Sequence, residues 1–432
     1  MGLLAMLLWL PHNVFSDGRF RFQALSALLE HHGLSPSVPY SLIGPFFSSP
    51  LWLLGKDPKT SEIWVSYYNF CLFALSLGVV YWLLKDWVDR RLLRKFFLVL
   101  IVASMFAAHI MTYYGEVFTA LCVGFGVLAV LLRGSSVGGW IAIVLGVANT
   151  PATLLGLGLM MLKQMLDSKR LRYVLVVVAA GGLIMAEAWL RRGSPFATGY
   201  ANDAGYHTVM PYSGQPGFSY PFFLGLLSIL FSFGKGLIFF VPGLLLPVRS
   251  VLLKMQQEKK LELYRAYGLW LCFIIGLILV YARWWSWYGG TFWGPRFFLI
   301  ASIPASFAIA LRLQNNREAS LLTNLFTLFV FALSGWVGIS GAVFTQSTDI
   351  PLCGNHNYAL EAFCHYVPEF SVLWHPFVVH QYLDPHQIKY VLYCLVVLVY
   401  LATPLVVRII HQLVEVANTY ARPYLDFKTW RF

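Results

Sequence analysis

Residues 266–312 read "AYGLWLCFIIGLILVYARWWSWYGGTFWGPRFFLIASIPASFAIALR". Two apolar runs flank the segment 281–298, which holds four Trp, two Tyr, three Phe, three Gly and two Arg. Each run is continuously apolar and near the ~20 residues that a helix needs to cross a bilayer, whereas strands of a membrane barrel alternate apolar and polar residues. This stretch therefore predicts two membrane-spanning helices joined by an aromatic loop.

The same pattern recurs along the whole chain. Of its 432 residues 58% are hydrophobic and 12% are charged, against about 25% charged residues in a soluble domain. We predict an all-α, polytopic transmembrane helix bundle that forms a single domain over 1–432. About twelve spans are expected, at 1–12, 62–84, 95–114, 116–132, 139–149, 151–162, 172–190, 236–248, 266–285, 297–312, 319–345 and 387–408.

Two of these regions have special features. The start lacks a basic segment and a small-residue cleavage site, so no cleavable signal peptide is expected. The first span is short, and it either begins at the membrane surface or has a natural start upstream. Farther on, "ANTPA" interrupts 139–162, because Pro151 lacks an N–H and restricts the residue before it. We expect a hairpin there that enters and leaves on one side.

The net charge of +12 indicates topology rather than nucleic-acid binding. Lys and Arg accumulate in cytoplasmic loops of membrane proteins. Most basic residues fall into one set of loops, which we assign to the cytoplasm together with both termini. The loops on the outer side hold only Arg19, Arg21, Lys56, Lys59, Arg191, Arg192, Lys235, Arg283, Arg296 and Lys389.

Three outer segments are long: 13–61, 191–235 and 346–386. The first contains "RFRFQALSALLEHHG", which predicts an interfacial helix ended by Gly33. Its expected apolar face consists of Phe20, Ala24, Leu25, Leu28 and Leu29. The second ends in an apolar stretch that is too short to span and is expected to be re-entrant or interfacial.

The third outer loop contains two of the six cysteines, Cys353 and Cys364. In an oxidising outer location their close spacing favours a disulfide. A metal site with His356 and His365 is the alternative, although this spacing fits no strong zinc pattern. The other four cysteines lie in apolar spans, where a thiol serves as a small packing residue.

Two acidic residues are candidates for chemistry on the outer side. Asp17, in "FSDGRF", is either a carboxylate base at the membrane surface or a cap of the helix that follows. Glu116, in a short outer turn, is a second acid, a ligand to a hydroxyl, or an ordinary turn residue.

Two cations and an aromatic group complete the candidate site. Arg296, in "GPRFF", and Lys235, in "SFGKG", either bind a phosphate or reach to lipid headgroups. The aromatic residues form either an interfacial belt or a wall for a sugar or an acceptor. The wall candidates are Trp285, Trp287, Tyr288 and Trp293.

One carboxylate with two cations fits a particular class of reaction. Glycoside hydrolysis uses two carboxylates, one of them an acid for a poor leaving group. A phosphate leaving group needs no acid, because cations stabilise its developing charge. The set therefore fits transfer of a sugar from a lipid phosphate to a hydroxyl.

These motifs and their order resemble the GT-C superfamily of polytopic glycosyltransferases, and most of all bacterial members distantly related to the protein-mannosyl and aminoarabinose transferases. The resemblance covers nearly the whole chain. It rests on "FSDGRF", "GSPFATGY", "GLLSILFSFGKGLIFFVPGLLL" and "WWSWYGGTFWGPRFF".

The resemblance implies a catalytic Asp in the first outer loop, which matches Asp17, and cations around the lipid phosphate, which match Lys235 and Arg296. It implies a polyprenyl-phosphate sugar donor, a lipid or glycan acceptor, and a bacterial inner membrane with the site facing outward. This chain has Asp17-Gly18-Arg19 where relatives carry paired acids, which argues against a metal held by such a pair. No cofactor is expected, and a divalent metal is left open.

Two other classes remain as alternatives. A transporter or lipid flippase would favour inverted repeats or charges inside spans. We find no repeat, and most ionisable residues avoid span centres. A structural subunit that binds lipid or partners is the second alternative.

Overall fold

The computed structural model describes residues 1–132, 136–197, 199–200, 208–215, 217–259, 262–344, 353, 358–379 and 382–426. Parts of the predicted loops 191–235 and 346–386 lie outside these ranges. Within them every regular element is a helix, apart from one isolated bridge between Asn13 and Thr112. The prediction of an all-α fold is confirmed for this part of the chain.

The helices of the first half begin with short elements and end with a long one. They are α1 (Gly2–Trp9), α2 (Asp17–His31), α3 (Ile43–Phe46), α4 (Ser49–Trp52), α5 (Pro58–Ser66), α6 (Tyr68–Leu84), α7 (Arg90–Val102), α8 (Phe106–His109), α9 (Gly115–Leu132), α10 (Val137–Asn149), η1 (Pro151–Thr153), α11 (Leu154–Ser168), η2 (Leu171–Tyr173) and α12 (Val174–Arg192).

The second half mixes short helices with long ones, including the two longest of the described part. They are α13 (Phe222–Phe231), α14 (Leu237–Phe240), η3 (Pro242–Leu245), α15 (Arg249–Lys259), α16 (Leu263–Tyr281), η4 (Arg296–Ala301), α17 (Ser302–Gln314), η5 (Asn316–Glu318), α18 (Leu321–Val343), α20 (Glu361–Tyr366), η6 (Pro368–Phe370), η7 (His375–Phe377) and α21 (Pro385–Asp426).

Seven helices of the described part are long and apolar enough to cross a membrane. Each coincides with one of the spans expected from the sequence, and together they indicate a membrane protein. They are Pro58–Leu84, Gly115–Leu132, Leu171–Arg192, Leu263–Tyr281, Arg296–Gln314, Leu321–Val343 and Pro385–Thr419.

The other five expected spans are short or broken helices, so the count of twelve is not confirmed. In the region of 95–114, α7 ends at Val102, and the hydroxyl of Ser104 donates to the Leu100 carbonyl at 2.6 Å. In 236–248, α14 has four residues, and Pro242 then begins a 3-10 turn because it has no N–H to continue the helix. The remaining three are α1, α10 and α11.

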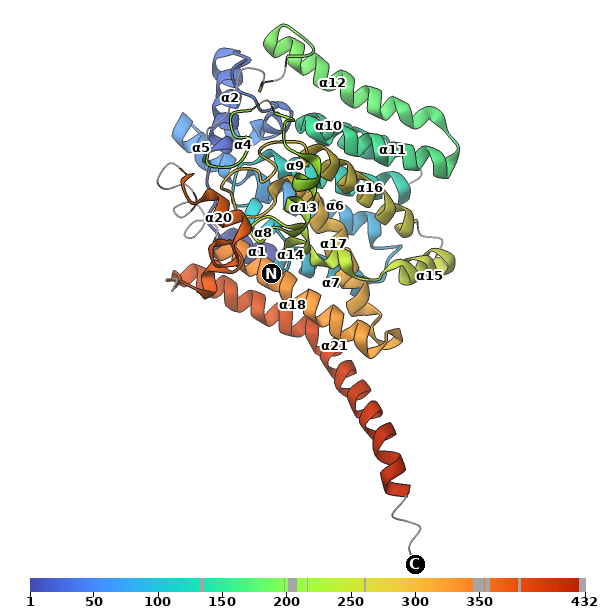
Figure 1. Cartoon of the computed structure of the whole chain (residues 1–432). Helices are drawn as coiled ribbons and strands as arrows, with labels where there is room; N and C mark the ends of the chain where they lie inside the picture. The colour runs from blue at the N-terminus through green and yellow to red at the C-terminus, as the bar shows by residue number, and fades with distance from the viewer. Residues whose placement is uncertain are drawn as a thin grey trace, which may run out of the picture.

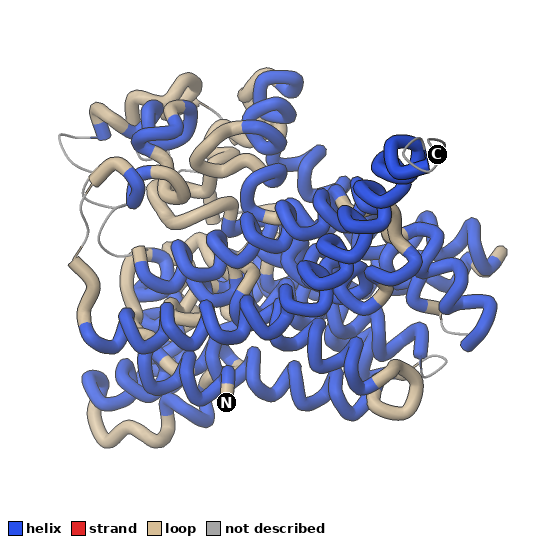
Figure 2. Tube along the Cα trace, turned by 90° about the horizontal axis from the view of Figure 1, so that it is seen from below, coloured by secondary structure: helices blue, strands red, loops and turns tan. Residues whose placement is uncertain are grey.

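The long helices run side by side, and the short ones gather at one end of the bundle. α9 packs along α10, α11 along α16, α7 along α17, and α18 along α21. In Figure 1 α2, α4, α5 and α20 lie at one end, and α15 lies at the opposite end. We call these the site end and the α15 end. Figure 2 shows loops concentrated around the site end, while α21 extends beyond the bundle in Figure 1.

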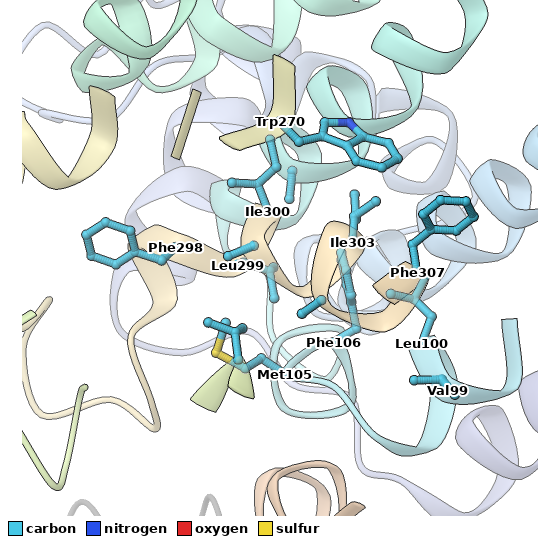
Figure 3. Packing of buried hydrophobic residues seen from close by; sticks show 14 of the residues in the cluster. Val99, Leu100, Met105, Phe106, Trp270, Phe298, Leu299, Ile300, Ile303 and Phe307 are labelled. Carbon is cyan, nitrogen blue, oxygen red and sulfur yellow. The ribbon is translucent and has the colours of Figure 1, made fainter. Parts of the chain in front are cut away.

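A dense core surrounds η4 and the start of α17. Ile300 and Ile303 lie there near Trp270 of α16 and Phe106 (Figure 3). The ring of Phe298 packs edge-on against Tyr281 of α16, with ring centres 5.8 Å apart. The indole N–H of Trp270 donates to the Gly124 carbonyl of α9 at 2.9 Å. A buried, close-packed segment has little freedom to shift, so this core fixes where Arg296, the first residue of η4, is held.

The helix expected in the first outer loop forms as α2, but its buried face differs from the expected one. It ends at His31, and His32 adopts the left-handed conformation with φ 55°. Phe20, expected on the apolar face, is exposed, whereas Arg21 is buried with Ala24 and Leu25. This buried face turns toward the bundle, where the guanidinium of Arg21 packs against Gly115 at the start of α9.

Candidate active site

Three of the predicted site residues meet in one cluster at the site end. Nη1 of Arg296 donates to Oδ2 of Asp17 at 2.7 Å. The same nitrogen lies 3.6 Å from Oε1 of Glu116. The side chains of Arg296, Asp17 and Glu116 are 9%, 14% and 13% exposed, so the cluster is largely buried yet retains access from outside. We call these three residues the charged cluster.

The aromatic loop holds the guanidinium of Arg296 from several sides. Nε donates to the carbonyl of Gly289 at 2.8 Å. The guanidinium carbon lies 4.4 Å from the ring centre of Phe292, 5.3 Å from that of Phe297 and 5.4 Å from that of Tyr114. Cation–π contacts of this kind stabilise a guanidinium at a desolvated site. The loop and Tyr114 therefore hold the guanidinium of Arg296 through Nε and the ring faces, and the Gly289 bond uses neither Nη1 nor Nη2.

Backbone contacts hold the start of α2 against the start of α9. The N–H of Asn13 donates to the Met111 carbonyl at 2.9 Å. A Cβ on Gly18 would lie 3.0 Å from the Tyr113 carbonyl oxygen, so glycine allows this close approach. Nδ2 of Asn69 donates to the carbonyl of Thr112 at 2.6 Å. These contacts bring Asp17 to Glu116, although the two are far apart in sequence.

The geometry at Asp17 differs from that of a helix cap. Asp17 is the first residue of α2, and Ser16, in the capping position, makes no side-chain capping hydrogen bond. Ser16 has a φ of 49°, a conformation that a non-glycine residue adopts only at a cost. The carboxylate of Asp17 is directed to Arg296 instead, which favours a role in the charged cluster.

Asp17 is held in its ionised form. Burial by itself would raise the pKa of its carboxyl group, but the charge of Arg296, hydrogen bonding with Tyr40 and Arg296, and the charge of Arg21 outweigh it. The pKa of Asp17 therefore lies below its usual value. Burial and the charge of Asp17 raise the pKa of Tyr40, whose hydroxyl stays protonated.

Tyr40 and the arginine that holds it were not predicted from the sequence. Arg191, at the end of α12, donates to the carbonyls of Leu34, Ser35, Val38 and Tyr40 at 2.6–3.0 Å. It also donates to Glu187 at 2.8 Å. Arg191 thus shapes the loop that presents Tyr40 to Asp17. The sequence shows only that Glu187 and Arg191 lie four residues apart on one helix, where they can pair. It does not show which loop carbonyls Arg191 binds.

Lys235, predicted to contact a lipid phosphate, lies beneath the aromatic loop. Its Nζ donates to the carbonyls of Phe292 and Gly294, the second at 3.1 Å. The glycine beside it, Gly234, packs so closely on the Cys364 carbonyl that a Cβ would lie 2.1 Å from that oxygen. Lys235 therefore supports the backbone two residues before Arg296.

The four residues predicted to form a sugar or acceptor wall are buried, and the contacts given below are with residues outside the charged cluster. The indole N–H of Trp293 donates to the hydroxyl of Ser340 at 3.4 Å. Trp287 and Tyr288 pack against His365, with ring centres 5.9 and 4.6 Å away. Trp285 is also buried. The rings that contact the guanidinium of Arg296 are instead Phe292, Phe297 and Tyr114.

Beyond these rings lies a buried acid and histidine pair in α20. Oε1 of Glu361 is 3.9 Å from Nε2 of His365, and both side chains are almost fully buried. Burial lowers the pKa of His365 to about 4, so the imidazole is neutral at pH 7. A disulfide joins Cys353 to Cys364 in the same helix.

The pairing of Arg296 with Asp17 predicts strong energetic coupling. Arg296→Gln leaves two carboxylates close together without their cation, and we expect it to lower the free energy of unfolding by about 3–5 kcal/mol. Asp17→Asn removes one of those carboxylates, so the double variant should recover part of the loss. Thermal unfolding of purified protein in detergent measures all four forms, and strictly additive effects would contradict the coupling.

No protein-family model, curated protein or solved structure matches this chain. Among the described residues no group of three or more His, Cys, Asp or Glu could hold a metal ion. The charged cluster, its place at one end of an apolar helix bundle and the chemistry of its side chains are therefore the features that bear on function.

Proposed function

We propose that the protein is a membrane glycosyltransferase that moves a sugar from a polyprenyl-phosphate donor to a hydroxyl of a lipid or glycan acceptor. The observation that carries the proposal is the buried contact of Asp17 and Glu116 with Arg296 at the end of a membrane helix bundle. It supplies an ionised carboxylate and a fixed cation at one end of a bundle of apolar helices. A lipid phosphate with its tail between helices fits this position.

Asp17 acts as the base in the proposed reaction. Its carboxylate accepts the proton of the acceptor hydroxyl while that oxygen bonds to the anomeric carbon. The bond from the anomeric carbon to the phosphate oxygen breaks, and the lipid phosphate leaves with the electron pair. No acid is needed at the leaving group, since cations stabilise the charge that develops on it. One displacement of this kind inverts the anomeric centre.

Arg296 serves two purposes in this scheme. It orients Asp17 through the 2.7 Å contact, and its positive charge lies where a departing phosphate benefits from it. Lys235 contributes by holding the backbone at Gly294. Glu116 shares the cation with Asp17 and keeps the guanidinium in place, so its removal has a smaller effect than that of the base.

We also propose the topology of the GT-C superfamily for this chain, with twelve crossings and the site end outside. Short helices such as α1, α7 and α14 would then cross the bilayer as broken segments. Irregular backbone is tolerated at membrane depth where protein surrounds it, and α7 and α14 are packed within the bundle. A bacterial plasma membrane is the proposed location.

The base assignment predicts the effect of Asp17→Asn. This variant keeps the shape of the side chain but cannot accept the proton, so sugar transfer should fall about 10²–10⁴-fold while donor binding is largely kept. Transfer from a polyprenyl-phosphate sugar, measured with purified protein in nanodiscs, provides the test. Glu116→Gln is the matched control and should lose less.

Acid sensitivity gives a second readout of the same assignment. Because the pKa of Asp17 in the ligand-free protein lies below its usual value, transfer at low donor concentration should persist to a pH below that at which an ordinary aspartate is protonated. Near-normal transfer by Asp17→Asn would disprove the role as base, and an equal loss in Glu116→Gln would move that role to Glu116.

The proposed orientation predicts which side reagents can reach. Ser37, between α2 and α3, and Gln257, in α15, are both exposed and lie at opposite ends of the bundle. In intact cells a membrane-impermeant thiol reagent should label Ser37→Cys and spare Gln257→Cys. The parent chain, with its four free cysteines, gives the background. Labelling of Gln257→Cys alone would place the site in the cytoplasm.

A further inference from the structure

Arg21 is a buried cation whose nitrogens are not fully engaged. Only 7% of the residue's surface is exposed. Within the described part of the chain, buried Nε and Nη1 have no hydrogen-bond partner, and no carboxylate pairs with the guanidinium. Arg191, equally buried, uses all three of its nitrogens on carbonyls and Glu187. A buried charge without partners is costly unless a ligand completes its contacts.

The guanidinium of Arg21 lies between an aromatic ring and the start of a long helix. Its carbon is 4.6 Å from the ring centre of Tyr40. On another side it packs on Gly115, where a Cβ would lie 2.7 Å from Nη1 and 2.8 Å from Nη2. Gly115 is the first residue of α9, which has 18 residues. The first N–H groups of a helix have no partner inside it and carry a partial positive charge.

The nearby carboxylates do not neutralise this arrangement. Asp17 and Glu116 are both directed to Arg296, which is therefore offset by two negative charges. Asp17 is influenced by the charge of Arg21 but makes no ion pair with it. The guanidinium of Arg21 therefore lies next to the positive N-terminal end of α9. Asp17, the proposed base, is one turn away along α2.

We propose that Arg21 and the N-terminus of α9 form the binding site for the phosphate group of a phosphate ester, which is a diester in the sugar donor and a monoester in the released lipid. A guanidinium presents two parallel N–H groups to phosphate oxygens, and a helix N-terminus adds backbone donors. Residues four apart on a helix face the same way, so a phosphate at Arg21 lies beside Asp17. The site itself stands on the contacts above, whereas its assignment to the donor's lipid phosphate rests on the proposed function.

The experiment measures binding and not turnover. The full chain is placed in phosphatidylcholine nanodiscs and titrated with a polyprenyl monophosphate, with the polyprenol of the same length, and with inorganic phosphate. Arg21→Gln should weaken binding of the polyprenyl monophosphate by about 10- to 100-fold, the effect of losing a charge-assisted hydrogen-bonded pair. Arg19→Gln is the matched control, since it removes the same charge from an exposed position of the same helix.

Gly115→Ala provides a second variant that retains every charge. Its methyl group would displace the guanidinium and should weaken phosphate binding as well. Thermal unfolding of the ligand-free proteins serves as the folding control, and Arg21→Gln should unfold no earlier than the parent, because it removes a charge that lacks a partner. An early unfolding temperature with unchanged phosphate binding would show a structural arginine and overturn the site.

The comparison of ligands and variants separates this inference from the proposed function. Arg21-dependent binding of both inorganic phosphate and the polyprenyl monophosphate supports a site for the phosphate group, and tighter binding of the lipid supports the donor as its source. Loss of binding in Arg296→Gln but not in Arg21→Gln would place the phosphate at Arg296 and overturn the inference. Arg21-dependent binding without sugar transfer would retain the site and refute the transferase.

Discussion

The contact between Asp17 and Arg296 joins residues 279 positions apart, and much of the site end is arranged around it. Taking a carboxylate and a guanidinium out of water costs several kcal/mol per ion, and their attraction offsets that cost only with good geometry and further hydrogen bonds. The aromatic loop meets this requirement through the Gly289 carbonyl and the ring of Phe292. Glu116 adds a second negative charge at 3.6 Å. The pair is therefore stable only where loop, α2 and α9 meet.

The surrounding polar groups explain how chain segments far apart in sequence are held in register. Asn149, at the end of α10, donates to the Gly115 carbonyl at 2.9 Å and accepts from the N–H of Gly44 at 3.0 Å. Arg191 holds the loop before Tyr40, and Lys235 holds the loop before Arg296. Each of these side chains satisfies buried backbone carbonyls, which would otherwise lose hydrogen bonds with water. These hydrogen bonds position the backbone segments that carry Tyr40 and Arg296.

The sequence allowed the class of fold and part of the site to be predicted, for identifiable reasons. Continuous apolar runs predicted about twelve spans, and seven of them are long apolar helices in the described part of the chain, because length and hydrophobicity suffice to recognise such a helix. Breaks such as the one after Val102 depend on a local serine contact and were not foreseen. Asp17, Glu116 and Arg296 were chosen one by one from their loops, but their convergence is a property of tertiary packing. Arg21 was counted only as a charge outside the membrane, since nothing local reveals that its helix face turns inward.

The low pKa of Asp17 has a consequence for the proposed chemistry. A carboxylate stabilised by Arg296 is reliably ionised but is a weak base. A phosphate bound at Arg21 would place negative charge one helical turn from Asp17. It would offset the charge of Arg21, which contributes, after Arg296, to the lowered pKa of Asp17. Like charges raise the pKa of a neighbouring carboxyl group. The donor itself would therefore strengthen the base when an acceptor hydroxyl must be deprotonated, and the empty site would hold Asp17 in a less reactive state.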